Sequence, residues 1–313
     1  MSDDNKSNDI IEYIISEESK GLRVDQGIAT ENKQFSRSLI QKWIKDGLIK
    51  VNNKFVKSKN ILLENDKITI SPIENISTDY IDPQNIKIDI AYEDKHLIII
   101  NKQNNIICHP AAGHKNGTIA NGMIYLFPEL KNLPRAGLIH RLDKNTTGLL
   151  ITARTIESYT ALVKIMQERK ISRYYTAYCH GLVMKNDLIN KPISRHKTDR
   201  KKMGININGK EAITEYSVIK NYKASTKLKL KLQTGRTHQI RVHMQYIGFP
   251  LIGDQTYGMK VNKENQNIKS FTRQALHAKS LCFLHPITNK KIIIKSELPD
   301  DLINLENILN NEQ

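Results

Sequence analysis

Apolar and polar residues alternate over much of the chain from about residue 89 to the C-terminus. Residues 226–232 alternate lysine and leucine, which is typical of a strand in a sheet with one face in water. Alternation or short apolar runs predict strands at Ile88–Tyr92, Leu97–Lys102, Leu149–Ala153, Tyr174–Cys179, Ala212–Tyr222, Thr226–Leu232, Leu276–Phe283 and Lys291–Lys295. Helical spacing predicts helices at Thr155–Arg169, Thr237–Tyr246 and about Asp300–Leu309. The pattern therefore predicts one large, strand-rich domain over residues 89–313.

The pattern of residues 15–71 differs and predicts a small α/β unit. Apolar residues at positions 39, 40, 43 and 44 share one face of a helix that Ser36 would cap and Gly47 would end. Two short strands follow about an Asn52-Asn53 turn, and Lys67–Ser71 alternates like another strand. Residues 1–14 are expected to be a flexible tail, and residues 72–88, with two prolines and no sustained period, a linker. A length of 313 residues fits two such domains.

The charge balance points to a polyanionic partner. Lysine and arginine total 48 against 32 acidic residues, a net charge of +16. An excess of this size favours nucleic acid, because each neutralised phosphate releases a condensed counterion. A chain this rich in Ile, Asn and Lys can also be basic through codon composition, with no partner at all. The first unit also carries many basic residues. Residues 191–202 (KPISRHKTDRKK) form the densest basic stretch, which is either a phosphate-binding loop or a solvated loop.

Several classes of protein are disfavoured by the sequence. The three cysteines, Cys108, Cys179 and Cys282, are far apart and odd in number, which argues against a disulfide framework and fits a reducing cytoplasm. The polar, acidic N-terminus is unlike a signal peptide, and the longest apolar runs are too short to cross a bilayer. His238 and His243 are five residues apart, without the spacing of a helical zinc site. A cytoplasmic protein without a metal is therefore expected.

Three clusters carry candidate chemistry. HRLDKNTTGL, residues 140–149, puts Asp143 between Arg141 and Lys144, and cationic neighbours favour the ionised carboxylate that a nucleophile or base requires. An aspartate capping its own turn is the alternative. RYYTA, residues 173–177, offers a tyrosine either for packing in a strand or for stacking on a flipped base. TGRTHQIRVHM, residues 234–244, puts Arg236 at a strand-to-helix junction, where it can reach a site or form a structural ion pair.

Taken together and in this order, the three clusters resemble the signature segments of the large-subunit ribosomal RNA pseudouridine synthases, and most closely those of the D-type members. The segments INKQNNIICHPAAG, PRAG, PISRH, FPLIGDQTYG and RQALHA extend the likeness over nearly all of residues 89–313. Residues 15–71 resemble the S4 RNA-binding module, with SRSLIQKWIKDGLIKVN as its core.

The resemblance implies an α+β fold: a small S4-type α/β RNA-binding domain, then a synthase domain with a mixed, largely antiparallel β-sheet core flanked by helices. It implies isomerisation of uridine to pseudouridine in large-subunit (23S-type) ribosomal RNA, without cofactor or metal. The implied partner is this RNA or a pre-ribosomal particle, and a monomer is expected.

The resemblance also assigns roles. Asp143 matches the catalytic aspartate, Arg236 the arginine that pairs with it, and Tyr175 the tyrosine that stacks on the uracil, with Tyr174 the weaker candidate. The RNA-facing positions are Arg141, which matches an arginine that enters the RNA helix, and His140 beside it, and Leu232 is expected to form a pocket wall. Further RNA contacts are expected from Arg37, Lys42 and Lys45 in the first unit and from Arg195, Lys197 and Arg200 in the basic stretch.

Two other functions compete with a synthase. A non-catalytic RNA-binding or ribosome-assembly protein would have no strict need for Asp143. A hydrolase or nuclease would require paired carboxylates or a metal cluster, and neither is evident in the sequence. The synthase is preferred because Asp143, Tyr175 and Arg236 occur together in the expected order.

Overall fold

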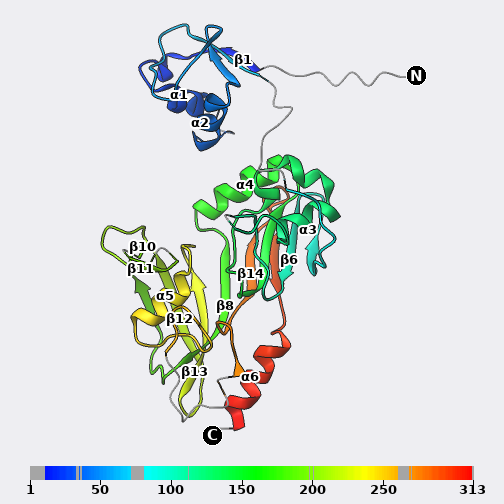
Figure 1. The fold of residues 1–313 in the computed structure, drawn as a ribbon, viewed down its shortest axis with the longest axis vertical. Helices are drawn as coiled ribbons and strands as arrows, with labels where there is room; N and C mark the ends of the chain where they lie inside the picture. Colours follow the sequence, from blue (N-terminus) through cyan, green and yellow to red (C-terminus); the bar gives the residue numbers. More distant parts are fainter. Residues whose placement is uncertain are drawn as a thin grey trace, which may run out of the picture. The chain divides into compact units, whose positions relative to one another are not determined.

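The computed structural model describes residues 11–311 apart from 33, 34, 36, 72–80, 112, 197, 200, 260–267 and 269. The chain divides into two compact units, Met1–Ser77 and Thr78–Gln313 (Figure 1). Each unit has its own buried apolar core.

The first unit is a four-stranded antiparallel sheet with two helices. Its elements are β1 (Ile11–Ile14), the 3-10 turn η1 (Glu17–Ser19), α1 (Val24–Glu31), α2 (Arg37–Lys45), β2 (Ile49–Val51), β3 (Lys54–Phe55) and β4 (Lys67–Ile70). The strand order is β1-β4-β2-β3. Ile28 of α1 and Ile40 and Trp43 of α2 are buried against the sheet. Asn52 and Asn53 both have positive φ, which the tight turn between β2 and β3 requires.

Two features of this unit differ from the expectation. Strand β1 lies within the segment expected to be a tail, and its residues pair with β4 from Ile11↔Ile70 to Ile14↔Lys67. The sequence of β1 shows no hydrophobic periodicity that would predict a strand, and β1 forms through its pairing with the distant strand β4. Helix α1 was not predicted either. The predicted N-cap Ser36 lies outside the described residues.

The second unit is built on a nine-stranded sheet, which bears out the predicted α+β fold. The strand order is β5-β6-β7-β14-β8-β13-β12-β9, with β15 pairing β14. Among the described strands of this sheet, β7 and β14 pair in parallel and the other pairs are antiparallel. The strands are β5 (Ile90–Glu93), β6 (Leu97–Lys102), β7 (Thr147–Ala153), β8 (Ser172–His180), β9 (Asp187–Asn190), β12 (Ile213–Asn221), β13 (Ser225–Leu232), β14 (Leu276–Leu284) and β15 (Lys291–Lys295).

Helices and a small hairpin complete this unit. They are α3 (Ile119–Leu126), the 3-10 turns η2 (Pro128–Asn132) and η3 (Pro134–Gly137), α4 (Ile156–Gln167), α5 (Gln239–Tyr246), α6 (Asp300–Asn311) and the hairpin of β10 (Ile193–Arg195) with β11 (Met203–Ile205). Figure 1 shows α5 beside the β12–β13 half of the sheet and α4 at the other half. Helix α3, strand β9 and the β10–β11 hairpin were not predicted, because each is short and shows no sustained hydrophobic periodicity.

The second half of the expected linker belongs to this unit. Ile81 is buried in its core, and Gln84 donates its backbone N–H to Asn121 of α3 at 3.1 Å. Asn121 Nδ2 in turn donates to Asp82 O at 2.8 Å. Residues 81–88 therefore pack against this unit without regular secondary structure, and their sequence resembles a linker because it has neither helical nor strand periodicity. Within the described part of the chain, every helix is too short or too polar to cross a membrane.

Candidate active site

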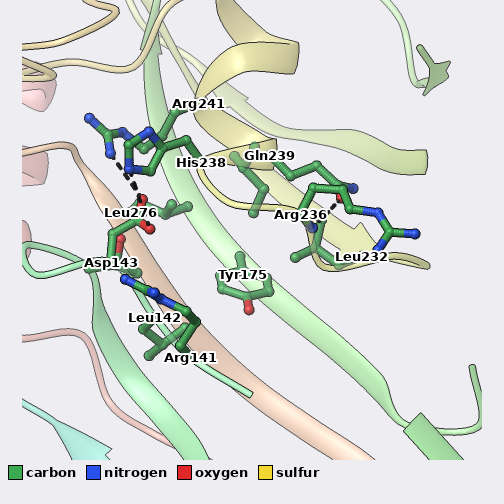
Figure 2. Close-up of a pocket in the computed structure, with 12 residues that line it drawn as sticks. Arg141, Leu142, Asp143, Tyr175, Leu232, Arg236, His238, Gln239, Arg241 and Leu276 are labelled. Carbon is green, nitrogen blue, oxygen red and sulfur yellow. Dashed lines mark hydrogen bonds and ion pairs between the residues drawn. The ribbon is translucent and has the colours of Figure 1, made fainter. Parts of the chain in front are cut away.

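Asp143 lies in the loop that joins η3 to β7. Its side chain is 18% exposed and lines a pocket together with residues of β8, β13, α5 and β14, among them Tyr175, Leu232, Arg241 and Leu276 (Figure 2). The carboxylate Oδ2 accepts a hydrogen bond from Arg241 rather than from its own turn. The capping role considered for Asp143 is therefore not the one that the described contacts give it.

Two buried side chains fasten the loop from one side. Cys108 Sγ lies 3.3 Å from both the backbone N and O of Leu142. Lys102, which is 1% exposed, donates from Nζ to the carbonyls of Gln103, Ile106 and Lys144 at 2.8, 2.9 and 2.9 Å. Burial lowers the pKa of Lys102 to about 8. All three ammonium protons are thus used to hold backbone, one of them on the residue after Asp143.

A second set of contacts fastens the loop from the β14 side. Arg273 Nη1 donates to Asn145 O at 3.1 Å, and Gln274 Nε2 donates to Thr146 Oγ1 at 3.1 Å. Thr147 Oγ1 and His277 Nδ1 are 2.9 Å apart. With both ends and the middle of the loop fixed in this way, the Asp143 side chain is presented from a rigid support.

Gly148 allows the parallel pairing of β7 with β14. It has φ +108, and a Cβ added there would lie 2.4 Å from the carbonyl oxygen of Ala278. No larger residue can bring β7 this close to β14. The glycine of HRLDKNTTGL is therefore explained by close backbone approach.

Arg241 of α5 is the cation that pairs with Asp143. Its Nη1 is 3.0 Å from Asp143 Oδ2, while its Nε and Nη2 donate to the two carboxylate oxygens of buried Asp254 at 2.7 and 2.9 Å. Burial alone would lower the pKa of Arg241, but the bonds to Asp254 and the charge of Asp143 raise that pKa above its ordinary value. Burial would raise the pKa of Asp254, but Arg241 and two backbone amides hold it below its ordinary value. A permanent positive charge therefore lies beside the Asp143 carboxylate.

The prediction that Arg236 pairs with Asp143 is wrong. Arg236 Nε donates to the carbonyl of Glu211 at 2.9 Å, and Figure 2 shows its guanidinium pointing away from Asp143. The reason is the direction of the chain: Arg236 precedes a left-handed turn at His238, and Arg241 follows it on the buried side of α5. Both arginines are in the same motif, so the sequence alone could not choose between them.

Gln239 is a site residue that the sequence reasoning missed. Its Oε1 accepts from Arg236 N and Thr234 Oγ1 at 2.9 and 2.8 Å, and its Nε2 donates to Ile213 O and Thr214 Oγ1 at 3.0 Å each. Both ends of the buried amide are thus satisfied, and the turn ahead of α5 is tied to β12. A glutamine in the middle of a polar motif gave no signal of this role.

The two tyrosines of β8 point to opposite faces of the sheet. Tyr175 is 5% exposed and lines the pocket with Leu232, the residue predicted as its wall (Figure 2). Burial raises the pKa of Tyr175. The Tyr174 ring lies instead under Lys229 Nζ, 4.7 Å from the ring centroid. Of the two, only Tyr175 can offer its ring to a group beside Asp143.

Arg141 and His140 are adjacent but differ in their surroundings. Arg141 is exposed and lines the pocket. His140 Nε2 accepts the backbone N–H of Ile151 at 3.1 Å, and burial lowers the pKa of His140 to about 3. His140 is half-buried and its Nε2 is taken up by the N–H of Ile151, so an RNA contact of His140 stays a prediction that cannot use this nitrogen.

The predicted peripheral RNA contacts stay predictions, and the structure describes only the surroundings of some of these residues. Arg195 and Lys45 are exposed. Arg37 is partly engaged, since its Nε is 2.8 Å from buried Asp25. The side chain of Lys42 and the whole of Lys197 and Arg200 lie outside the described residues. Over the described ranges, no three His, Cys, Asp or Glu side chains gather as metal ligands would.

The comparisons with known proteins agree with this architecture. Residues 96–246 match a family model described as RNA pseudouridylate synthase, and residues 22–68 match the S4 domain. Ribosomal large subunit pseudouridine synthase D of Haemophilus influenzae is 40% identical over 303 residues, 94% of this chain and 93% of the relative. The proteins of that name in Pseudomonas aeruginosa and Escherichia coli K12 are each 39% identical, over 94% of this chain and 93% of the relative.

Solved structures with the same fold are also found. The structure titled human RNA pseudouridylate synthase domain containing 4 aligns with a TM-score of 0.58 at 23% identity, over 71% of this chain and 93% of that one. Human RNA pseudouridylate synthase domain containing 1 aligns with a TM-score of 0.55 at 25% identity, over 69% and 85%.

Proposed function

Because the chain belongs to the RNA pseudouridylate synthase family and carries an S4 domain, we propose that it isomerises uridine to pseudouridine in large-subunit ribosomal RNA, with Asp143 as the catalytic group. The main support is the likeness of about 40% along nearly the whole chain to synthases named for that RNA. A further support is the pocket in which Asp143 meets Arg241 opposite Tyr175.

The reaction breaks the N1–C1′ bond of uridine, turns the uracil and joins C5 to C1′, after which the proton on C5 is lost and one proton is gained at N1. The Asp143 carboxylate acts either as a nucleophile at C1′ or as a base that removes the 2′ proton, and both routes need the charged form. The guanidinium of Arg241, 3.0 Å from Oδ2, places a positive charge beside this carboxylate.

The remaining pocket residues hold the base outside its helix. Flipping a nucleotide costs a few kcal/mol, roughly, and stacking on an aromatic ring offsets part of that cost. Tyr175 and Leu232 offer the aromatic and apolar surface, and exposed Arg141 can occupy the gap that the base leaves in the RNA. We further propose that the chain acts in the cytoplasm, as a monomer and without a cofactor.

The test is tritium release from ribosomal RNA labelled at C5 of uridine. The wild-type chain is expected to release tritium without added metal, while Asp143→Asn, which keeps the shape of the side chain, is expected to bind the RNA and release none above background. Near-normal release by that variant would refute the role of Asp143. Cleavage of the RNA would instead indicate a nuclease.

A map of pseudouridines with and without the protein supplies the target positions. Loss of pseudouridine from large-subunit RNA, restored by the wild-type chain and not by Asp143→Asn, is the expected result. Loss confined to another class of RNA would contradict the proposed substrate.

A further inference from the structure

The two oxygens of the Asp143 carboxylate have different neighbours. Oδ2 accepts the hydrogen bond from Arg241 at 3.0 Å, whereas Oδ1 faces His238 Nε2 at 3.9 Å (Figure 2). A separation of 3.9 Å is too long for a hydrogen bond. One donor on one oxygen leaves the carboxylate free to turn about its Cβ–Cγ bond, so Arg241 alone does not fix the direction of the lone pairs on Oδ1.

A chain of hydrogen bonds at Nδ1 of His238 is compatible with the tautomer that carries the proton on Nε2. The Tyr257 hydroxyl oxygen accepts the backbone N–H of Met203 at 2.8 Å, and it lies 2.8 Å from His238 Nδ1. Met203 can only donate, so the single hydroxyl proton of Tyr257 is free for the histidine. When Tyr257 donates to Nδ1, the neutral ring carries its proton on Nε2, the atom that faces Asp143.

The ring of His238 is also held in orientation. Its backbone is left-handed, with φ 58, at the N-cap of α5, and its ring meets that of Tyr257 edge to face with centroids 5.6 Å apart. Tyr257 is only 3% exposed and lies under the Arg241 guanidinium at 5.0 Å. A non-glycine residue in this conformation is costly, and such strain is typical of functional sites.

The charge around His238 favours a neutral ring. Burial is the largest influence and lowers the pKa of His238, while the charges that face it are those of Asp143 and Asp254, which raise it, and of Arg241 and Arg141, which lower it. A neutral donor can orient a carboxylate without adding a second full positive charge, which would make the carboxylate a weaker base or nucleophile.

We propose that His238 is a positioning residue, which in the RNA-bound enzyme donates its Nε2–H to Oδ1 of Asp143 and, with Arg241 on Oδ2, fixes the plane of the carboxylate. The free enzyme holds the two groups slightly too far apart, and such bonds commonly shorten when the substrate closes the site. Tyr257 sets the tautomer that makes the donation possible. The inference rests on the proposed role of Asp143.

The first test compares two substitutions at this position. His238→Ala is expected to lower kcat for pseudouridine formation roughly 10- to 100-fold, as expected for a lost hydrogen bond to a charged group, with the RNA dissociation constant within about 2-fold of wild type. His238→Gln is expected to recover most of that loss, because its amide Nε2–H can donate from a similar place. A normal kcat for His238→Ala, or no recovery by glutamine in a variant that melts like wild type, would overturn the inference.

The second test removes only the hydroxyl that sets the tautomer. Tyr257→Phe is expected to lower kcat about 3- to 10-fold, a fraction of the loss for the histidine itself. Tyr222→Phe is the matched control, since its buried hydroxyl bonds Glu306 instead and Tyr222 does not line the pocket. Equal kcat values for Tyr257→Phe and the control would contradict the tautomer argument.

Wild type and Asp143→Asn are assayed on the same RNA in parallel. If wild type forms no pseudouridine, the proposed function or substrate is at fault. If wild type is active and Asp143→Asn is not, the His238 variants test the inference alone.

Discussion

At the scale of single residues, the site depends on which of two nearby arginines faces the aspartate. Arg241 joins Asp143 to Asp254, and Arg236 is bonded to a backbone carbonyl outside the pair. Arg241 brings a buried positive charge beside the Asp143 carboxylate, and Asp254 holds the guanidinium in that place.

Substitution of the two arginines by glutamine separates their roles. Arg241→Gln is expected to lower kcat at least ~100-fold. It is also expected to lower the free energy of unfolding by about 3–5 kcal/mol, because buried Asp254 is left unpaired. Arg236→Gln is expected to keep kcat within about 10-fold, because its side chain only donates to Glu211. Turnover at low temperature, with denaturant melts of both variants, measures the difference. A larger loss of kcat for Arg236→Gln would restore the original assignment.

His140 makes the fold sensitive to acid. Burial lowers the pKa of His140 to about 3 in the folded chain, below the ordinary value of 6.5 that the unfolded chain has. Between these values the unfolded state binds more protons, so the stability contributed by neutral His140 is present above pH 6.5 and is lost as the pH falls. His140→Gln keeps an acceptor for Ile151 N–H without a titrating group and is expected to show a shallower fall in unfolding free energy from pH 7 to 4.5. Identical slopes in urea melts would contradict this account.

At the scale of elements, the parallel contact of β7 with β14 supports the catalytic loop. Arg273, Gln274 and His277 reach the loop from the start of β14 or just before it, and Lys102 reaches it from the end of β6. The sheet thus supports both sides of the loop between η3 and β7, which has little regular structure of its own.

Gly148→Ala tests this support. The added methyl group would meet Ala278 O at 2.4 Å, so the strands must separate and the loop must move. We expect a loss of about 3 kcal/mol or more of unfolding free energy and a clear fall in kcat at temperatures where the variant is folded. Gly117→Ala is the control, since Gly117 also has positive φ (+71) but open space around it, and should cost only about 1–2 kcal/mol of backbone strain. Equal costs would show that close approach is unimportant.

At the scale of the whole molecule, the two units each have their own core, but the net charge of +16 lies in the second, because residues 1–77 hold 12 basic and 12 acidic residues. If both units contact the RNA backbone, affinity must fall steeply with salt, because each phosphate contact releases counterions. Exposed Lys45 in the first unit and exposed Arg195 in the second offer one test position each.

Lys45→Gln and Arg195→Gln are each expected to weaken RNA binding and to reduce the slope of log affinity against log salt by about 1, without a change in kcat at saturating RNA. Lys170→Gln is the control, since Lys170 is exposed and its Nζ is paired with Glu168 at 2.6 Å. Filter binding at several salt concentrations measures the slopes. A slope unchanged in either test variant would remove that residue from the RNA contacts.

The sequence by itself determined the β-rich second domain and the S4-like first unit, and it singled out Asp143 and Tyr175, which line one pocket. Alternation is a local property of a strand, and the three motifs are continuous stretches of chain, so neither needed knowledge of distant contacts. The tertiary structure alone decided the rest. Arg241 displaced Arg236 because a left-handed turn between them redirects the chain, and His140 became an internal acceptor because Ile151 lies beside it. The roles of Lys102, Cys108 and Gln239 were hidden for the same reason: each depends on a partner far along the chain, which only folding brings within hydrogen-bonding distance.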